Sequence, residues 1–259
     1  MERVVLEDAG LVGYAACFAR QRELFDRLVS GKVRESGCEA GDGCPDAGYG
    51  QEDRPCDSGA CPAGSPDRGV APATQVLILC EHPAVYTLGK SGHEGNLLVD
   101  ETFLRKINAS YYRTDRGGDI TFHGPGQLVG YPILDLERLG LGLREYVDLL
   151  EEAVIATAAD YGIGAGRLAG ATGVWVGAGG ARPRKLCAIG VRSSRYVTMH
   201  GFALNVTTDL GYFGYINPCG FTDKGVTSLA AELGRAVMMD EVKVRYGRHF
   251  ARLFGVELE

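Results

Sequence analysis

Two residues with complementary chemistry, Cys219 and Lys185, lie near the two ends of the stretch KLCAIGVRSSRYVTMHGFALNVTTDLGYFGYINPCG. Cys219 follows a proline and precedes a glycine, which favours an exposed turn over a strand interior. A thiol at such a turn can meet a substrate, and a nearby ammonium would hold it as the reactive thiolate. The two residues are 34 positions apart, so only the fold can bring them together. The alternative from spacing alone is an inert small hydrophobe at Cys219 and a solvated charge at Lys185.

A second stretch, RGGDITFHGPGQLVGYPI, extends from Arg116 to Ile133 and places glycines, an arginine and a histidine around an apolar core. Adjacent glycines at 117 and 118 let the backbone approach a ligand closely. Arg116 can orient an anionic or carbonyl group, and His123 can exchange a proton near neutral pH. The stretch matches neither the P-loop nor the dinucleotide-binding glycine pattern. The alternative is a glycine-rich hairpin with a hydrogen-bonded histidine.

Composition limits the class of protein. The chain has 259 residues, is 45% hydrophobic and has a formal net charge of −6. It can therefore bury one substantial core, and it lacks a basic footprint for nucleic acid. The start, MERVVLEDAG, has neither the cationic region nor the apolar region of a secretory signal, and no apolar run has the length of a membrane span. We expect a soluble cytoplasmic protein that binds neither nucleic acid nor membrane.

Cysteine usage points to one unusual segment. Four of the eight cysteines lie close together (Cys38, Cys44, Cys56, Cys61) and four are scattered (Cys17, Cys80, Cys187, Cys219). In a reducing compartment the scattered four are expected to be thiols. The clustered four lack the C-x2-C pairing of structural zinc, so no metal site is predicted, although a metal knuckle is an alternative. Residues 30–73 also hold five of the ten prolines, which predicts a flexible insert within one catalytic domain spanning 1–259.

Hydrophobic periodicity predicts an alternation of strands and helices. We predict strands at 3–6, at VLILCEH from Val76, at VYTLG, at GVWVG, and at the apolar runs LCAIGV and YVTMHGFALNV, the last broken by Gly201. Helices are predicted from Leu11 to about Ser30, with Asp8 available as a cap, and at residues 102–108. A longer helix, from Leu143 to Tyr161, is predicted to have a solvated acidic face. Two further helices are predicted, at TSLAAEL and around Val242 to Leu253. The acidic face of the helix from Leu143 to Tyr161 consists of Glu145, Asp148, Glu151 and Glu152.

Three stretches taken together resemble the lipoyl(octanoyl) transferases. They are RGGDITFHGPGQLVGYPI, RKLCAIGVRSSRYVTMHGFALNV and INPCGFTDKGVTSL, and EHPAVYTLGK resembles the segment upstream of the glycine-rich loop in that family. The resemblance extends from Val76 to Phe254. It implies an acyltransferase of the biotin and lipoate ligase superfamily, with an α+β fold whose mixed sheet, flanked by helices, encloses an acyl tunnel. The implied reaction transfers octanoyl or lipoyl through a cysteine thioester, as the first step of endogenous lipoate biosynthesis.

The resemblance also implies partners and residue roles. The donor would be octanoyl-acyl carrier protein, and the acceptors would be lysines on lipoyl domains of 2-oxoacid dehydrogenase complexes and on the glycine cleavage H protein. No cofactor is implied. Cys219 and Lys185 match the catalytic pair. The substrate-binding segments fall on Arg116, Gly117, Gly118, Asp119, Ile120, Thr121, Phe122 and His123, on Ala188, Ile189 and Gly190, and on Gly201, Phe202 and Ala203.

Residue chemistry is consistent with these roles. A free cysteine is only a few per cent thiolate at pH 7, and a nearby ammonium raises that fraction. The thiolate can take an acyl group from a thioester, and Lys185, or less plausibly His123, can accept the proton of the incoming amine. Backbone N–H groups after Cys219 can stabilise the oxyanion. Leu186, Ile189, Phe202 and Leu204 can line an alkyl tunnel or simply pack in the core.

Three alternatives remain at this point. An ATP-dependent lipoate or biotin ligase of the same superfamily would use the lysine but would not need the cysteine of PCG at 218–220. A non-catalytic acyl- or carrier-binding module would need neither member of the pair. A thiol-based metal or redox protein would depend on the clustered cysteines alone.

Overall fold

The computed structural model describes residues 1–37, 73–217 and 224–259. Most of the predicted insert, with its four cysteines, lies outside the described residues. So does Cys219, the predicted nucleophile.

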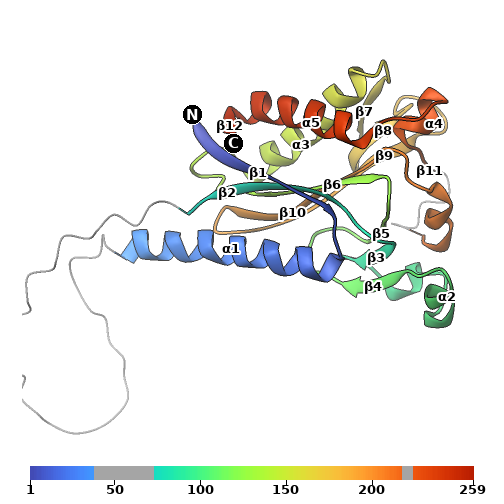
Figure 1. Cartoon of the computed structure of the whole chain (residues 1–259), viewed down its shortest axis with the longest axis horizontal. Coiled ribbons are helices and arrows are strands. Elements are labelled where there is room, and N and C mark those ends of the chain that lie inside the picture. Colours follow the sequence, from blue (N-terminus) through green and yellow to red (C-terminus); the bar gives the residue numbers. More distant parts are fainter. Residues whose placement is uncertain (38–72, 218–223) are drawn as a thin grey trace, which may run out of the picture.

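One mixed sheet of nine strands forms the centre of the fold (Figure 1). Its strands are β1 (Glu2–Leu11), β2 (Gln75–Glu81), β6 (Gln127–Ile133), β7 (Ala165–Leu168), β8 (Ala171–Val176), β9 (Arg184–Ser194), β10 (Val197–Asn205), β11 (Gly225–Val226) and β12 (Val256–Leu258). Their spatial order is β12-β1-β2-β6-β10-β9-β8-β7, and β11 pairs with β9. β1 is parallel to both β2 and β12, whereas β6, β10, β9, β8 and β7 are joined by antiparallel pairs.

A second, three-stranded sheet packs at one end of the molecule (Figure 1). It contains β3 (Val85–Leu88), β4 (Ser110–Arg113) and β5 (Ile120–His123), in the order β4-β3-β5. A small apolar cluster, which includes Tyr86 and Phe122, packs this sheet against the 3₁₀ helix η2 (Leu210–Tyr215). Aromatic stacking contributes to this contact, since the rings of Phe122 and Tyr212 are 4.6 Å apart.

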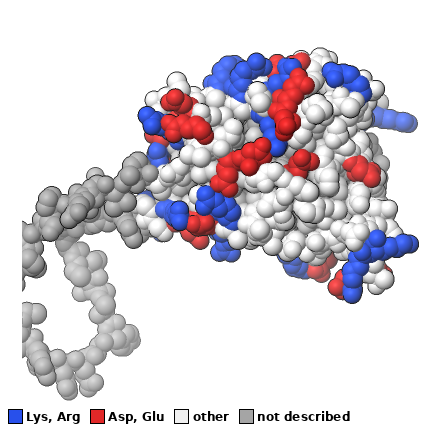
Figure 2. Space-filling view, viewed as in Figure 1, with Lys and Arg blue, Asp and Glu red and all other residues white. Residues whose placement is uncertain are grey.

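Helices cover both faces of the large sheet. α1 (Tyr14–Gly37) lies along one face, and α3 (Leu143–Ala159) and α5 (Met239–Phe254) cover the other (Figure 1). The remaining helices are α2 (Glu101–Lys106), α4 (Leu229–Leu233) and the 3₁₀ helix η1 (Glu94–Asn96). The result is the α+β fold with a mixed sheet flanked by helices that the family resemblance implies. Figure 2 shows acidic and basic side chains interspersed on one face. Within residues 1–37, 73–217 and 224–259, no helix is both long and apolar enough to span a bilayer.

Helical spacing of apolar residues explains how the two covering helices form. In α5, Val242, Tyr246, Phe250 and Phe254 recur every fourth position, and all four side chains are buried. The corresponding set in α3 is Tyr146, Leu150, Val154 and Ala158, which are buried in the same cluster. The helices predicted from Leu143 to Tyr161 and around Val242 to Leu253 are thus confirmed.

The N-terminal prediction was wrong in two details. Asp8 does not cap a helix: it lies within β1, accepts a hydrogen bond from the Gly10 N–H and forms an ion pair with Lys243. The helix begins later, at Tyr14, and extends past Ser30 to Gly37. Its last turns contain Lys32, whose ammonium lies 2.6 Å from the Asp135 carboxylate and 2.9 Å from the Arg195 carbonyl oxygen. These tertiary contacts are not visible in the sequence.

The acidic face of α3 also departs from the prediction. Glu151 is buried rather than solvated: its carboxylate accepts from the Arg167 guanidinium at 2.9 Å and from the Gly173 backbone N–H at 2.8 Å. A buried carboxylate requires such partners. Glu151 thus connects α3 to β7 and β8 at the edge of the large sheet.

The glycine-rich stretch 116–133 is not a hairpin. It forms two strands that belong to different sheets: β5 pairs with β3 in the small sheet, and β6 pairs with β2 and β10 in the large one. The chain crosses between the sheets at residues 124–126, where Gly126 has a φ of +79°. This crossing brings the small sheet against the large one.

Gly201 does not interrupt its strand, because β10 is continuous from Val197 to Asn205. A Cβ at position 201 would lie 2.1 Å from the Gly130 carbonyl oxygen on β6. We expect Gly201→Ala to destabilise the fold by about 3 kcal/mol, because the two strands must separate. The measurement is thermal unfolding, with Tm lowered by roughly 6–12 °C. Gly166→Ala is the matched control, since a Cβ at Gly166 meets nothing within 4 Å. Equal Tm values for the two variants would contradict this close approach.

Candidate acyl-transfer site

A cavity of about 650 Å³ is bordered by both sheets. Most of the residues predicted to bind substrate line it. They are Arg116, Gly118, Asp119, Ile120, Thr121, His123, Ala188, Ile189, Gly190, Gly201, Phe202 and Ala203, and Lys185 lines it as well. Gly117 and Phe122 lie just outside the lining: the Gly117 N–H donates to the Val191 carbonyl at 2.9 Å, and Phe122 is buried in the core of the small sheet.

Strand pairing explains why two distant segments meet in this cavity. β9 and β10 are antiparallel, and their register places Gly190 opposite Gly201, Ile189 opposite Phe202, and Ala188 opposite Ala203. The segments 188–190 and 201–203 therefore form one continuous patch of wall. Of the four residues considered for an alkyl tunnel, Ile189 and Phe202 line the cavity. Leu186 and Leu204 are fully buried in the core beside α3 and α5.

Glycines hold the Arg116 loop close to its neighbours. A Cβ at Gly190 would lie 2.9 Å from the Gly117 carbonyl oxygen, and one at Gly89 would lie 2.3 Å from that of Gly118. The buried Arg116 guanidinium donates to the Thr87 carbonyl at 2.6 Å and to the Thr87 hydroxyl at 3.0 Å. A buried cation in the wall provides a fixed positive field inside the cavity.

His123 is held in one tautomer by its neighbours. The Gln127 amide N–H groups donate to the Phe122 carbonyl and to the Asn205 side-chain oxygen, so the Gln127 oxygen must accept. It accepts from His123 Nδ1 at 2.8 Å, which leaves His123 Nε2 to accept from the Thr87 hydroxyl at 3.3 Å. Both ring nitrogens are therefore engaged. Burial lowers the pKa of His123 to about 3, which makes it a poor general base.

Lys185 lies on β9 between two neighbouring strands. Its ammonium is 4.6 Å from the centre of the Trp175 ring on β8, a cation–π contact, and the Trp175 indole N–H donates to Ala171 O at 3.0 Å. On the other side, β11 pairs Val226 with Lys185. The lysine thus lies in the cavity wall, with its ammonium over the Trp175 ring.

Residues that flank the undescribed segment 218–223 also belong to the cavity wall. Ile216 and Lys224 both line the cavity. Cys219 follows Ile216 by three positions and precedes Lys224 by five. The polar sequence TDKG around Lys224 predicts a well-hydrated ammonium in a turn, but Lys224 is half-buried and lines the same cavity as Lys185.

A polar pair that sequence reasoning missed borders the cavity near Arg116. His200 adopts a φ of +61° within β10 and lines the cavity, and its Nε2 donates to the Asp115 carboxylate at 2.7 Å. Asp115 also accepts from Arg192. The hydrogen bond from His200 is the main reason that the pKa of Asp115 falls to about 2, against the opposing effect of partial burial. The positive φ at a non-glycine residue shows that the fold holds His200 in place against local strain.

Three buried histidines near the cavity, His82, His123 and His200, have pKa values below the ordinary value of 6.5, in each case mainly because burial disfavours the charged ring. The unfolded chain binds a proton on each histidine near pH 6.5, and the folded chain does so only at lower pH. Folding stability is therefore lost as pH falls below about 6.5, for His123 down to about pH 3.

This linkage predicts the effect of His123→Gln. Between pH 7 and pH 5 the wild type should lose about 2 kcal/mol of unfolding free energy through His123 alone. The variant lacks the titrating ring, so its loss over the same range should be smaller by that amount. Urea denaturation at both pH values measures the difference. Equal losses of unfolding free energy in wild type and variant would mean that His123 is also protonated in the folded state over this pH range.

Known proteins identify the family to which this chain belongs. Residues 67–251 match the lipoyl protein ligase A/B catalytic domain family. An octanoyltransferase of Bacteroides fragilis is 53% identical over 246 residues, which cover 95% of this chain and 96% of that protein. The octanoyltransferase of Flavobacterium johnsoniae is 45% identical, with 99% of each chain covered. The chain belongs to the octanoyltransferases. It is an acyltransferase with a lipoyl protein ligase catalytic domain.

Solved structures agree with the fold of this octanoyltransferase-family chain. A bi-partite lipoate protein ligase of Thermoplasma acidophilum superposes with a TM-score of 0.62 at 15% identity, covering all of this chain and 86% of its own. A putative lipoate protein ligase from the same organism, solved with bound lipoic acid, gives a TM-score of 0.61 at 16% identity and covers all of this chain and 88% of its own. At these low sequence identities, the structural similarity shows a shared fold only.

Several cavity residues of this octanoyltransferase-family chain are not apparent from sequence reasoning. They include Tyr14, Gln127, Tyr131, Trp175, His200 and Asn205. One signal was available: Trp175 is the only tryptophan in the chain. Tyr14 falls within the helix predicted from Leu11 to about Ser30, and the polar residues lie in strands whose partners the sequence does not specify.

Proposed function

We propose that this octanoyltransferase-family chain transfers an octanoyl or lipoyl group from acyl carrier protein to a lysine of a lipoyl carrier domain. The transfer proceeds through a thioester on Cys219 and is the first step of endogenous lipoate biosynthesis. The acceptors in this proposal are the lipoyl domains of 2-oxoacid dehydrogenase complexes and the glycine cleavage H protein, and the reaction takes place in the cytoplasm. The chemistry requires no cofactor.

The observation that supports the proposal most strongly is a single cavity with an apolar wall and a cation. Ile189, Phe202 and Phe213 provide part of the apolar surface, and Lys185 lies on the same wall. An octanoyl chain has about seven carbons beyond its carbonyl, and their burial is worth about 5 kcal/mol. The volume of about 650 Å³ falls within the range of sites for small ligands.

The first half-reaction forms the acyl-enzyme. The Cys219 thiolate attacks the carbonyl carbon of the donor thioester, a new carbon–sulfur bond forms, and the bond to the carrier sulfur breaks. The carrier leaves as a thiolate and takes a proton from the Lys185 ammonium. Lys185 is then a neutral amine beside the acyl-enzyme.

The second half-reaction forms the amide. The neutral amine of the acceptor lysine attacks the Cys219 thioester, the carbon–nitrogen bond forms, and the cysteine leaves as the thiolate. Lys185 takes the amine proton, which restores the ammonium–thiolate pair. Each proton that Lys185 gives in the first step is recovered in the second, so one lysine serves both half-reactions.

The remaining cavity residues have supporting roles in this proposal. The Arg116 loop, residues 188–190 and residues 201–203 bind the acyl group, and the Arg116 charge favours the oxygen on which negative charge develops. His123 positions this wall through Thr87 and Gln127 rather than by proton transfer, because both of its ring nitrogens are engaged.

The test is intact mass spectrometry of the full-length protein after mixing with octanoyl-acyl carrier protein. We expect one octanoyl adduct that is removed by a lipoyl domain, which then gains the octanoyl mass. The reaction should proceed without ATP. An adduct-free protein that modifies the lipoyl domain only with ATP and free octanoate would indicate a ligase. Tight donor binding without an adduct or a product would indicate a binding module.

A further inference from the structure

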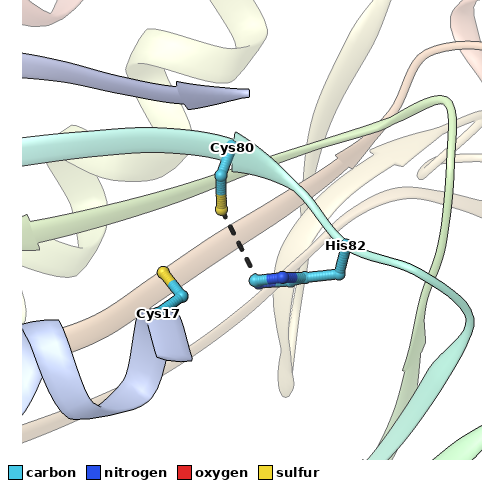
Figure 3. Close-up of side chains that lie close together, drawn as sticks. All are labelled: Cys17, Cys80 and His82. Atoms are coloured by element: carbon cyan, nitrogen blue, oxygen red, sulfur yellow. Dashed lines mark hydrogen bonds between the residues drawn. The ribbon is translucent and has the colours of Figure 1, made fainter. Parts of the chain in front are cut away.

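A buried cluster of two thiols and an imidazole lies behind the cavity wall (Figure 3). Cys17 is in the first turns of α1, Cys80 is in β2, and His82 follows that strand. All three are buried, and their Sγ and Nε2 or Nδ1 ligand atoms lie within 4.8 Å of one another. Cys17 and Cys80 are two of the four scattered cysteines, and the fold brings them together from positions 63 residues apart.

The His82 ring directs its unprotonated nitrogen toward Cys80 and Tyr131. Nδ1 lies 2.7 Å from the Val12 carbonyl oxygen, which can only accept, so Nδ1 carries the proton. In the neutral ring Nε2 is then the bare nitrogen. It lies 3.6 Å from Cys80 Sγ and accepts from the Tyr131 hydroxyl at 2.7 Å. An imidazole that donates its other N–H to a backbone carbonyl is the usual arrangement of a metal-binding histidine.

The spacing of the ligand atoms matches tetrahedral coordination. With Zn–S near 2.3 Å and Zn–N near 2.0 Å, the sulfur–nitrogen edge of a tetrahedron is about 3.5 Å. The Cys80 Sγ to His82 Nε2 distance of 3.6 Å already has this value. Since no distance among the three ligand atoms exceeds 4.8 Å, the cluster needs to contract by about 1.3 Å at most. A change in the Cys17 side chain can provide this contraction.

Charge also suits a divalent cation. Two thiolates and a neutral imidazole carry a total charge of −2, which a divalent ion neutralises, and a neutral complex avoids the cost of a buried net charge. Soft sulfur ligands with one imidazole favour Zn²⁺ over the hard cations Mg²⁺ and Ca²⁺. Binding would release the two thiol protons to solvent.

We propose that Cys17, Cys80 and His82 form a Zn²⁺-binding site of the Cys₂His type, with the fourth position facing Tyr131. Zn²⁺ at this site joins α1 to the end of β2. It also borders the acyl cavity, because Tyr131 and Tyr14 line that cavity and both contact the His82 ring. Metal binding therefore stabilises the fold and fixes one wall of the cavity.

Cobalt substitution tests the site directly. The protein is the full-length chain in which Cys38, Cys44, Cys56, Cys61 and Cys219 are replaced by serine, kept reduced with a phosphine. One equivalent of Co²⁺ should produce thiolate-to-metal charge-transfer absorption and the visible bands of tetrahedral Co²⁺. Zn²⁺ should displace it and, at 100 times its Kd, raise Tm by roughly 5–10 °C.

Variants in the same background locate the ligands. Cys17→Ser and Cys80→Ser should each weaken Zn²⁺ binding by more than about 100-fold, since even the loss of an outer partner costs 10–100-fold. Cys187→Ser removes a buried thiol of β9 outside the cluster and should bind as the parent does. Absence of thiolate bands in the parent would overturn the proposal whether or not the variants fold. So would a disulfide between Cys17 and Cys80 that forms on diamide treatment despite saturating Zn²⁺.

Discussion

Replacement of Cys219 by alanine will abolish the octanoyl adduct and lower the rate of transfer by at least about 1,000-fold, because alanine has no thiol to carry the acyl chain between donor and acceptor. Intact mass spectrometry with octanoyl-acyl carrier protein measures the adduct, and modification of a lipoyl domain measures the transfer. Both signals should disappear together. A variant that keeps a wild-type rate would exclude the covalent mechanism.

Cys187 is the natural control for this experiment. It lies two residues from Lys185, but its side chain is fully buried in β9 and donates to Ala188 O at 3.4 Å. Burial raises the pKa of the Cys187 thiol well above its ordinary value, so it does not supply a thiolate near neutral pH. Cys187→Ala should form the adduct at a rate within about twofold of wild type and lose about 1 kcal/mol of stability. An adduct on Cys187 in the Cys219→Ala protein would assign the nucleophile to β9 instead.

Lys185→Met will lower the transfer rate by about 100-fold or more, in the range that general acid–base groups contribute. It should also shift the midpoint of Cys219 alkylation upward by at least about one pH unit, the effect expected from removal of a close cation. Methionine retains the length of the side chain and its packing on Trp175, so the loss reports on the charge. Alkylation with a thiol-selective reagent across pH gives the midpoint.

Lys224→Met decides between two lysines that share one cavity. Our assignment requires the alkylation midpoint to move much less in Lys224→Met than in Lys185→Met. Lys185 packs on the Trp175 ring, and its backbone pairs with β11. Lys224 lines the same cavity immediately before β11. Lys106→Met, at an exposed position of α2, controls for the loss of any positive charge. If the larger shift occurs in Lys224→Met, the acid–base role belongs to Lys224.

Local sequence was sufficient for most elements of the fold. Periodicity placed α3 and α5 and their buried faces, and apolar runs placed β2, β3 and β8. These features depend on side chains a few positions apart, which the sequence displays directly. Predictions failed where a distant partner decides the outcome. Glu151 is buried only because Arg167 and Gly173 satisfy it, and the last turns of α1 are held through Lys32.

The segments that form the cavity were recognisable from their similarity to a family, and residues 116–123, 188–190 and 201–203 supply much of its wall. The arrangement of these segments relative to one another could not be recognised from the sequence. The register between β9 and β10, and the division of 116–133 between two sheets, depend on hydrogen bonds across the chain. Periodicity along the sequence carries no information on which strand pairs with which.

The sequence by itself indicated the class of chemistry in this protein through three stretches that resemble a known family: they contain a cysteine in PCG, a lysine before an apolar run and glycines beside Arg116. The tertiary structure alone decided which polar groups share a space. It placed Lys224 in the same cavity as Lys185, engaged both nitrogens of His123, and brought Cys17 within reach of Cys80 and His82. The physical reason is that electrostatic and coordination chemistry depend on distance through space, which only the packing of sheets and helices sets.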